Sequence, residues 1–200
     1  MSRGKTTPGD PATRRRILDS ALKLIVKRGG ADLTLAEVAR AARVSRQAIY
    51  LHFADRAELF IAVARHIDDL RGIPAAIQRI AGAPTGVAAI RVAVSLQARM
   101  NPDVWPVARA LDAVRRLDEA AERSWQDRLD ARLHGCRAIV SRLEQEGSLR
   151  PDLTVTVAAD LLWTLISLRM WEDLVLQRGW TAADYEQRIG DLAVATLTRG

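Results

Sequence analysis

The chain has 200 residues, of which 48% are hydrophobic and 27% charged, and its formal net charge is +6. A chain of this composition can bury a core without disulfide or metal support. The single cysteine, Cys136, excludes a disulfide framework and a zinc site built on several thiolates. No stretch approaches the ~18 apolar residues of a membrane span, and residues 1–16 lack the apolar segment of a secretory signal. We therefore expect a cytoplasmic protein that does not enter the membrane.

The positive charge is concentrated in the first third of the chain. Residues 1–60 contain 12 Lys or Arg and 6 Asp or Glu, whereas residues 61–200 contain 18 of each. A basic segment attached to a neutral body indicates a polyanionic partner, either nucleic acid or an anionic membrane surface. A solvated basic tail without any partner is equally consistent with the charge alone.

The residue pattern predicts an all-α chain of about ten helices. Residues 1–12 contain several glycines and prolines and few apolar side chains, and we expect a disordered tail there. A first helix is predicted over residues 13–28, with Thr13 as its N-cap and Gly29 and Gly30 at its end.

Two short helices and a longer fourth helix are expected next. Thr34 and Glu37 have the spacing of a capping box, in which each side chain bonds the backbone N–H of the other residue. Ser45 is expected to cap a helix over residues 46–52, and Asp55 to begin a fourth helix. Glycine and proline then predict further helices over residues 74–81, 85–100, 103–116, 119–146, 154–177 and 182–198.

Two short helices joined by a tight turn, after a longer helix, are typical of a helix-turn-helix. Ala39 and Ile49 are small or apolar where the two helices would touch, although an ordinary helical hairpin shares this spacing. The outward side chains Arg46, Gln47 and Tyr50 are more informative. Arg and Gln can each form two hydrogen bonds to guanine and adenine edges in the major groove.

Other polar residues near this pair of helices suit phosphate. Tyr50 and His52 can donate hydrogen bonds to phosphate oxygens, which position a helix without reading sequence. Thr34 offers a hydroxyl and backbone N–H groups at a helix N-terminus. Arg56 lies in the first turn of its helix, where a cation opposes the helix dipole. An external anion would explain Arg56, and a solvated charge is the alternative.

The segment from Thr34 to Leu59 resembles the DNA-binding head of the TetR family of transcriptional repressors. The resemblance is strongest in the run Ala48-Ile49-Tyr50-Leu51-His52-Phe53, followed by Arg56 and Leu59, and it covers about residues 13–62. It implies a homodimer that binds a palindromic double-stranded DNA operator and releases it when a small-molecule effector enters the body.

The resemblance assigns roles to individual residues. It implies phosphate contacts for Thr34, Tyr50, His52 and Arg56, base contacts for Arg46 and Gln47, and places Arg43 and Ser45 in the same DNA-binding surface. Three residues depart from the family pattern. Gln47 stands where a small residue is common, and Arg56 where lysine is usual. Arg43 replaces the usual glycine of the turn, which costs about 1 kcal/mol if φ is positive there; a phosphate bond could recover that cost.

The resemblance also divides the chain into a tail over residues 1–12, a helix-turn-helix DNA-binding domain over 13–54 and a ligand-binding and dimerisation domain over 55–200. Apolar stripes that could form the dimer interface contain Leu161, Leu165, Leu168, Ile189, Leu192 and Leu197, with the protomer's own core as the alternative. Residues that could line a ligand pocket are Met100, Trp105, Trp125, Trp163 and Met170, again with the core as the alternative.

Two arginines of the body, Arg99 and Arg169, lie on predicted helices that are otherwise apolar. Either could bind a ligand carboxylate, but an internal partner such as Asp160 or Glu172 is the preferred interpretation.

An enzyme is not expected, and neither is a cofactor or metal. The three histidines are not in a metal-binding spacing, and nucleotide-binding and hydrolase motifs are missing from the sequence. The competing hypothesis is an all-helical ligand-binding or membrane-surface protein whose basic segment touches anionic lipid.

Overall fold

The computed structural model describes residues 10–28 and 33–199, and the predicted end of the first helix at Gly29 and Gly30 lies outside these ranges. The helices are α1 (Pro11–Arg28), α2 (Leu35–Ala41), α3 (Arg46–Tyr50), α4 (Arg56–Leu70), α5 (Ile73–Ala81), α6 (Gly86–Arg115), α7 (Glu119–Gln145), α8 (Val155–Leu165), α9 (Leu168–Trp171), the π-helix η1 (Glu172–Gln177) and α10 (Ala182–Leu197). In the described ranges no strand forms, so the all-α prediction is confirmed. None of these helices has both the length and the apolarity that crossing a bilayer requires.

The chain forms two compact units. The head unit comprises Met1–Leu70 and Pro106–Gln126, and the body unit comprises Arg71–Trp105 and Asp127–Gly200. The helices α6 and α7 therefore each contribute residues to both units. The head unit also contains α4, which the sequence-based division after residue 54 assigned to the body.

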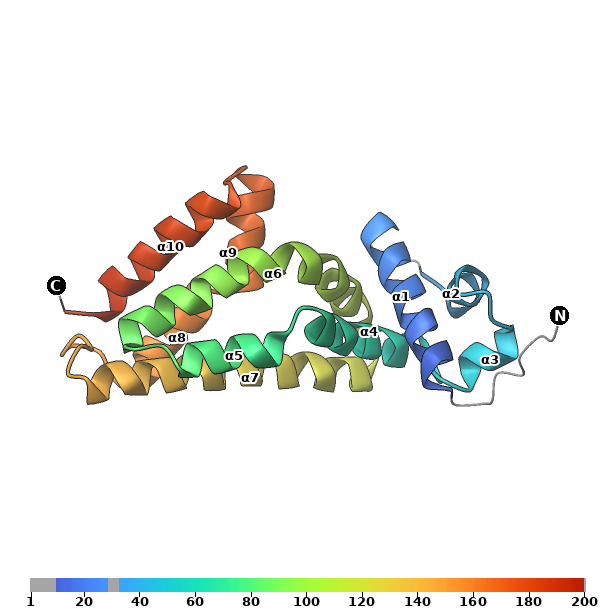
Figure 1. The fold of residues 1–200 in the computed structure, drawn as a ribbon, viewed down its shortest axis with the longest axis horizontal. Coiled ribbons are helices and arrows are strands. Elements are labelled where there is room, and N and C mark those ends of the chain that lie inside the picture. The colour runs from blue at the N-terminus through green and yellow to red at the C-terminus, as the bar shows by residue number, and fades with distance from the viewer. Residues whose placement is uncertain (1–9, 29–32, 200) are drawn as a thin grey trace. The chain divides into compact units, whose positions relative to one another are not determined.

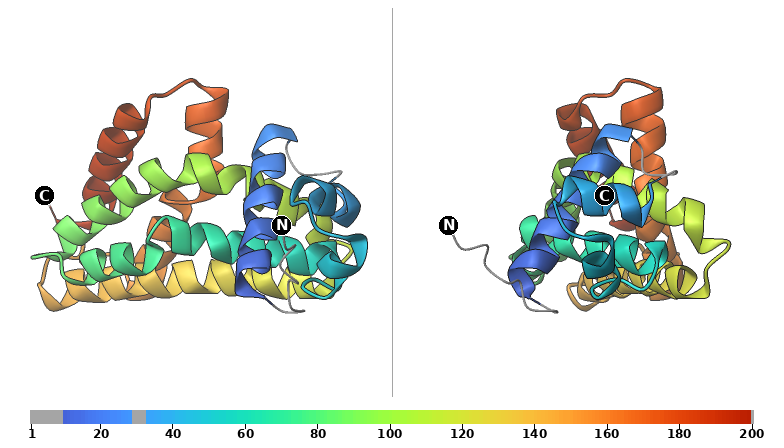
Figure 2. Two further views of the ribbon diagram at one scale, coloured as in Figure 1. Left: turned by 45° about the vertical axis from the view of Figure 1, so that its right-hand side comes forward. Right: turned by 90° about the vertical axis from the view of Figure 1, so that its right-hand side faces the viewer.

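The head unit is built around α1, which packs against α2 and α4, while α2 packs against α3 (Figure 1). Its apolar side faces inward at helical spacing, so Ile17, Ala21 and Ile25 are completely buried. Phe60 of α4 is also completely buried. Figure 2 shows α1 from two further directions, lying beside α2 in both. The basic N-terminal segment thus has its own core.

The start of α1 differs from the sequence-based expectation. Asp10 is the cap, because its carboxylate accepts hydrogen bonds from the backbone N–H groups of Ala12 (3.2 Å) and Thr13 (3.1 Å). Pro11 then occupies the first helical position, where the missing N–H costs nothing. Thr13 is buried and donates its hydroxyl hydrogen to Asp10 (2.9 Å), so its prediction as the N-cap is wrong. Residues 11 and 12 are helical, although the predicted tail extends through residue 12.

The other predicted caps of the head are confirmed. Thr34 and Glu37 form both halves of the capping box. The Ser45 hydroxyl accepts a hydrogen bond from the Ala48 N–H (3.0 Å) at the start of α3. At α4, the Asp55 carboxylate accepts from the N–H of Glu58 (2.8 Å). These local bonds fix where each short helix begins.

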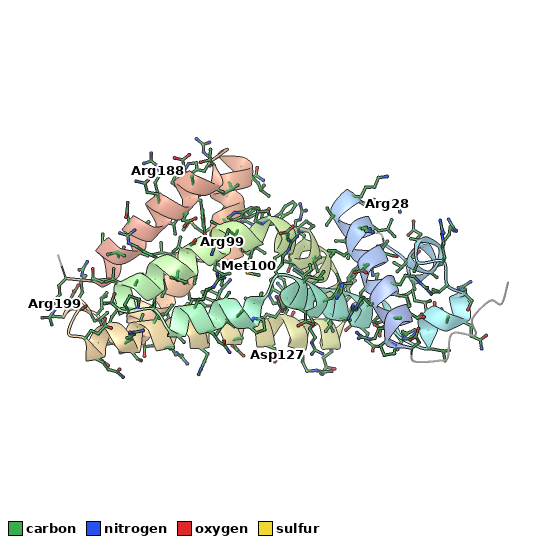
Figure 3. The ribbon with its side chains drawn as sticks, in the orientation of Figure 1. Arg28, Arg99, Met100, Asp127, Arg188 and Arg199 are labelled. Atoms are coloured by element: carbon green, nitrogen blue, oxygen red, sulfur yellow. The ribbon has the colours of Figure 1, made fainter. Side chains whose placement is uncertain are left out.

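In the body unit the first part of α6 lies between α10 on one side and α5 and α7 on the other (Figure 1). The main core gathers residues from α6, α7, α8, α9 and α10, among them Ile90, Val140, Leu143, Leu162, Trp171 and Tyr185. A smaller cluster joins Ala76 of α5 to Leu96 and Met100 of α6. Met100 is labelled on α6 in Figure 3 and is one of the residues of this smaller cluster.

Two predicted helix boundaries in the body are wrong. The expected stop at Asn101-Pro102 does not occur, and residues 85–100 and 103–116 instead form the single helix α6. Each proline removes one helical hydrogen bond at a cost of about 3 kcal/mol. Burial of Met100 and Val107 on either side of the stop offsets that cost.

The helix predicted over residues 154–177 is interrupted. It ends at Leu165, and Ser167 adopts an extended conformation and caps α9 by accepting from the Met170 N–H (3.0 Å). The π-helix η1 follows directly. Ser167 could serve either in a helix or as a cap, and the cap is what the structure uses.

The Ser45 cap yields a stability test. Because α3 has only five residues, Ser45→Ala should lower the free energy of unfolding by about 1 kcal/mol. The matched control is Ser20→Ala in the middle of α1, where the hydroxyl bonds only the Arg16 carbonyl and alanine is the better helix former. Chemical denaturation of both variants measures the difference, and equal effects would contradict the capping role.

Candidate nucleic-acid interface

The α3 helix separates its buried and exposed residues sharply. Ile49 is completely buried and fastens the helix to the head core. Arg46 and Gln47 are exposed, and Tyr50 is 48% exposed although it is a large aromatic residue. An exposed side of Arg, Gln and Tyr on a helix held from behind is suited to contact the edges and phosphates of a DNA groove.

The crossing of α2 and α3 depends on small side chains and on one unusual turn. Ala39 and Ala42 are almost completely buried, which allows the two helices to approach closely. The Val44 N–H donates to the Ala39 carbonyl (3.0 Å) across the turn. Arg43 has φ +54°, a left-handed conformation that disfavours any residue with a Cβ. The turn therefore requires positive φ, and Arg43 occupies it exposed to solvent.

The residues expected to contact phosphate lie around this helix pair, and they differ in solvent exposure and in the contacts that they already make. Thr34 is exposed, but its hydroxyl donates to Glu37 (2.9 Å), so that hydrogen is already used. His52 is half-buried, with its ring centre 6.3 Å from that of Phe53. The Arg56 guanidinium lies 5.8 Å from the centre of the Phe60 ring. Tyr50 is the most accessible hydroxyl donor of this set.

An ion pair ties α1 to α2 beneath this surface. Arg28, which extends from the last turn of α1 in Figure 3, donates to Glu37 at 2.7 Å. The hydrogen bond from Arg28, followed by those from the N–H and hydroxyl of Thr34, lowers the pKa of Glu37 to about 2. Glu37 therefore stays ionised and holds the box together, and its charge is compensated by Arg28. The exposed arginines 40, 43 and 46 do not share in this pair.

A groove on the head unit was not anticipated from the sequence. It is lined by Pro11, Arg14, Arg15, Leu18, Ala62, Arg65, His66 and Asp69 and has a volume of about 240 Å³. Three arginines gather here from α1 and α4. His66 also lies 2.7 Å from Asp19, joining the same two helices. The three arginines of the groove contribute to the positive charge of the head unit.

The residues predicted to line a ligand pocket do not form one group. Trp105 and Trp163 pack against the main body core, whereas Met100 belongs to the smaller cluster. Met170 is half-buried on α9. Trp125 lies in the head unit, where the Arg115 guanidinium is 5.0 Å from its ring centre.

The residues predicted for a dimer interface also divide. Ile189 and Leu197 are buried in the protomer's own core, which leaves them no exposed surface for a second copy. Leu165 and Leu168 are half-buried. Leu161 and Leu192 are 36% and 47% exposed, and they lie on α8 and α10, which pack against each other. Val157, one turn before Leu161, is also exposed and was not anticipated.

The arginines of the body differ from the sequence-based expectation. Arg99 is exposed, and Arg169 pairs with Asp173 (3.2 Å) instead of Asp160 or Glu172. The arginine that does face the interior is Arg132 of α7, which sequence reasoning missed. The sequence does indicate an inward position, because Arg132 lies four residues before buried Cys136 and eight before buried Val140 on the same helix.

Comparison with known proteins concentrates on the head. Residues 17–63 match the family model described as "Bacterial regulatory proteins, tetR family". The HTH-type transcriptional regulator AcrR of Shigella flexneri is 46% identical over 56 residues, which are 28% of this chain. The aligned segment spans only 26% of AcrR, about a quarter of that relative.

Two further similarities extend along the chain. The HTH-type transcriptional repressor LfrR of Mycolicibacterium smegmatis is 29% identical over 192 residues, covering 94% of this chain and 89% of LfrR. A protein from Saccharomonospora viridis, crystallised in complex with choline, has a TM-score of 0.81 at 20% identity and covers 96% of this chain and 100% of its own. The second similarity is one of fold.

The left-handed residue of the turn gives a test with an opposite-sign control. Arg43→Gly should raise the free energy of unfolding by about 1 kcal/mol, because glycine adopts φ +54° without a Cβ clash. Arg40→Gly removes the same charge inside α2, where glycine costs about 1 kcal/mol. Urea denaturation measures both variants, and a loss of stability in Arg43→Gly would contradict the proposed strain.

Proposed function

We propose that the chain is a member of the TetR family of bacterial regulatory proteins and acts as a cytoplasmic, ligand-responsive homodimeric repressor of transcription. The observation that carries this proposal is α3, where Ile49 is completely buried and Arg46, Gln47 and Tyr50 face solvent. The operator is a palindrome read by two copies of this helix, one in each half-site.

Each residue of the surface has a role in the proposal. Arg46 and Gln47 contact base edges, where each bidentate pair discriminates by about 1–3 kcal/mol. Tyr50, His52 and Arg56 bond phosphates, as do the N-terminal N–H groups that follow Thr34 and Ser45. Arg43 donates to a phosphate from the left-handed turn. These phosphate bonds set the register of α3 and the salt dependence of binding.

Dimerisation in the proposal uses the exposed apolar residues of α8 and α10. Val157 and Leu161 are one helical turn apart and therefore share a side of α8, and Leu192 is exposed on the adjacent α10. Burying these residues against a second copy removes apolar surface from water. Two heads must then lie about 34–36 Å apart to enter successive major grooves.

Effector binding in the body unit completes the mechanism. An effector that binds one arrangement of the heads better than the other shifts the population toward that arrangement, by no more than its difference in affinity for the two. DNA affinity falls by the same coupling factor. The choline-bound relative in fold supports a small-molecule site in such a body, and the identity of its ligand is a property of that protein.

Selection of bound sequences from a random DNA pool tests the DNA-binding role. We expect an enriched palindrome whose half-sites are about one helical turn apart. Gln47→Ala should relax the base preference at one position in each half-site by about 1–3 kcal/mol. Tyr50→Phe should weaken binding to every sequence by about tenfold per lost phosphate bond while leaving the preference unchanged.

Leu51→Ala is the control for that experiment, because Leu51 is exposed beside Tyr50 and has no assigned DNA contact. Salt-sensitive binding without any enriched motif would contradict the proposal. Binding to anionic vesicles in place of a motif would favour the alternative of a membrane-surface protein.

The dimer interface is tested by mass in solution. The wild-type chain should measure about twice its 22.0 kDa, and the double variant Leu161→Glu with Leu192→Glu should measure as one chain because two charges would be buried. Leu117→Glu is the control, since Leu117 is 90% exposed outside these helices. Multi-angle light scattering makes the measurement, and a dimeric double variant would move the interface elsewhere.

A further inference from the structure

An arginine lies inside the body unit against an aromatic wall. Arg132 is half-buried on the stripe of α7 that also carries buried Cys136 and Val140. Its guanidinium carbon is 4.3 Å from the centre of the Trp163 ring. The Trp163 indole N–H donates to the Leu129 carbonyl (3.2 Å), three residues before Arg132 on α7. The aromatic ring is therefore fixed in place and supports the cation through its π-face.

This arginine has no anionic partner. Within the described part of the chain, Arg132 forms no ion pair, and its buried Nε has no hydrogen-bond acceptor. The ionisable side chains that act on it electrostatically are Cys136 and Tyr185. Burial raises the pKa of each to about 12, so both are neutral at physiological pH. The ring of Trp163 lies against the positive charge of Arg132 and partly compensates it.

A second polar group in the body core is also unsatisfied. Tyr185 of α10 is completely buried, yet its hydroxyl has no hydrogen-bond partner among the described residues. Buried polar groups without a partner are rare and cost about 1–3 kcal/mol each. Tyr185 belongs to the core cluster against which Trp163 packs, and Arg132 lies over the Trp163 ring. The charge of Arg132 also opposes the rise that burial gives the pKa of Tyr185.

The chemistry of these groups selects one kind of ligand. A guanidinium presents a fork of N–H donors that matches a carboxylate, and a phenol adds a third donor to the same anion. Trp163 offers an apolar surface for the rest of the molecule. A cation such as a quaternary ammonium would be repelled by Arg132.

We propose that Arg132 and Tyr185 bind the carboxylate of a small amphipathic effector, whose apolar part packs against Trp163. This inference rests on the proposed function, because it names the ligand class of the effector site in the body unit. A buried cation without an ion pair is costly, and a carboxylate that pairs with Arg132 lowers that cost on binding.

Isothermal titration of the full chain without DNA tests the site with two acid–amide pairs of matched shape. The probes are benzoate with benzamide and octanoate with octanamide. For at least one pair we expect the carboxylate to bind about 10–100-fold more tightly than its amide, the range for hydrogen bonds to a charged group. Arg132→Met should abolish this preference while leaving amide affinity unchanged.

Two variants make the titration specific. Arg137→Met removes an exposed arginine five residues further along α7 and should keep the preference for the acid. Tyr185→Phe preserves the packing of the ring and should reduce acid affinity about tenfold with little effect on the amide. If Arg132→Met does not fold, Tyr185→Phe provides the test by itself.

The outcomes separate this site from the DNA-binding role. Acids that bind no more tightly than their amides, or a preference that survives in Arg132→Met, would overturn the carboxylate site. Gel shift with the selected operator is measured on the same variants, and each should bind DNA as wild type does in the absence of ligand. An acid preference in a chain that binds no DNA would support the site and reject the proposed repressor.

Discussion

The proposed DNA-binding surface depends on a helix too short to be stable alone. A helix of five residues in water loses more conformational entropy than its few hydrogen bonds return. Ile49 supplies the missing stability by inserting into the head core, and the Ser45 cap satisfies an N–H at the exposed end. The close crossing at Ala39 and the left-handed Arg43 serve the same purpose. Three side chains can therefore face solvent from a helix held only by its other side.

The head could be predicted further from sequence than the body because its determinants are local. Thr34 and Glu37 cap each other across three residues, and Ser45 caps the N–H three residues further on. Their spacing in the sequence is therefore enough to identify them. Asp10 and Thr13 are both cap-forming residue types, and Pro11, which favours the first helical position, identifies Asp10 as the cap.

The body depends on tertiary contacts, which a single sequence does not display. Ile189 and Leu192 occupy the same apolar helix, but only the packed structure shows that one is buried and the other 47% exposed. The same reason explains α6, where burial on both sides overrides a proline stop. The interior position of Arg132 follows from its spacing to Cys136. That no described residue supplies it with an anionic partner is visible only once the neighbouring helices are in place.

The positions of the tryptophans also determine which parts of the molecule intrinsic fluorescence can monitor. All five lie at position 105 or later, so α1 to α4 contain no indole and are silent under tryptophan excitation. Trp163 has its N–H bonded to a carbonyl and a guanidinium over its face, an environment that any arriving anion would alter. Four of the five tryptophans lie in the body unit and Trp125 lies in the head unit, so tryptophan emission reports mainly on the body, whereas α3 contributes none. A fluorophore placed on DNA would report separately on the proposed DNA-binding surface.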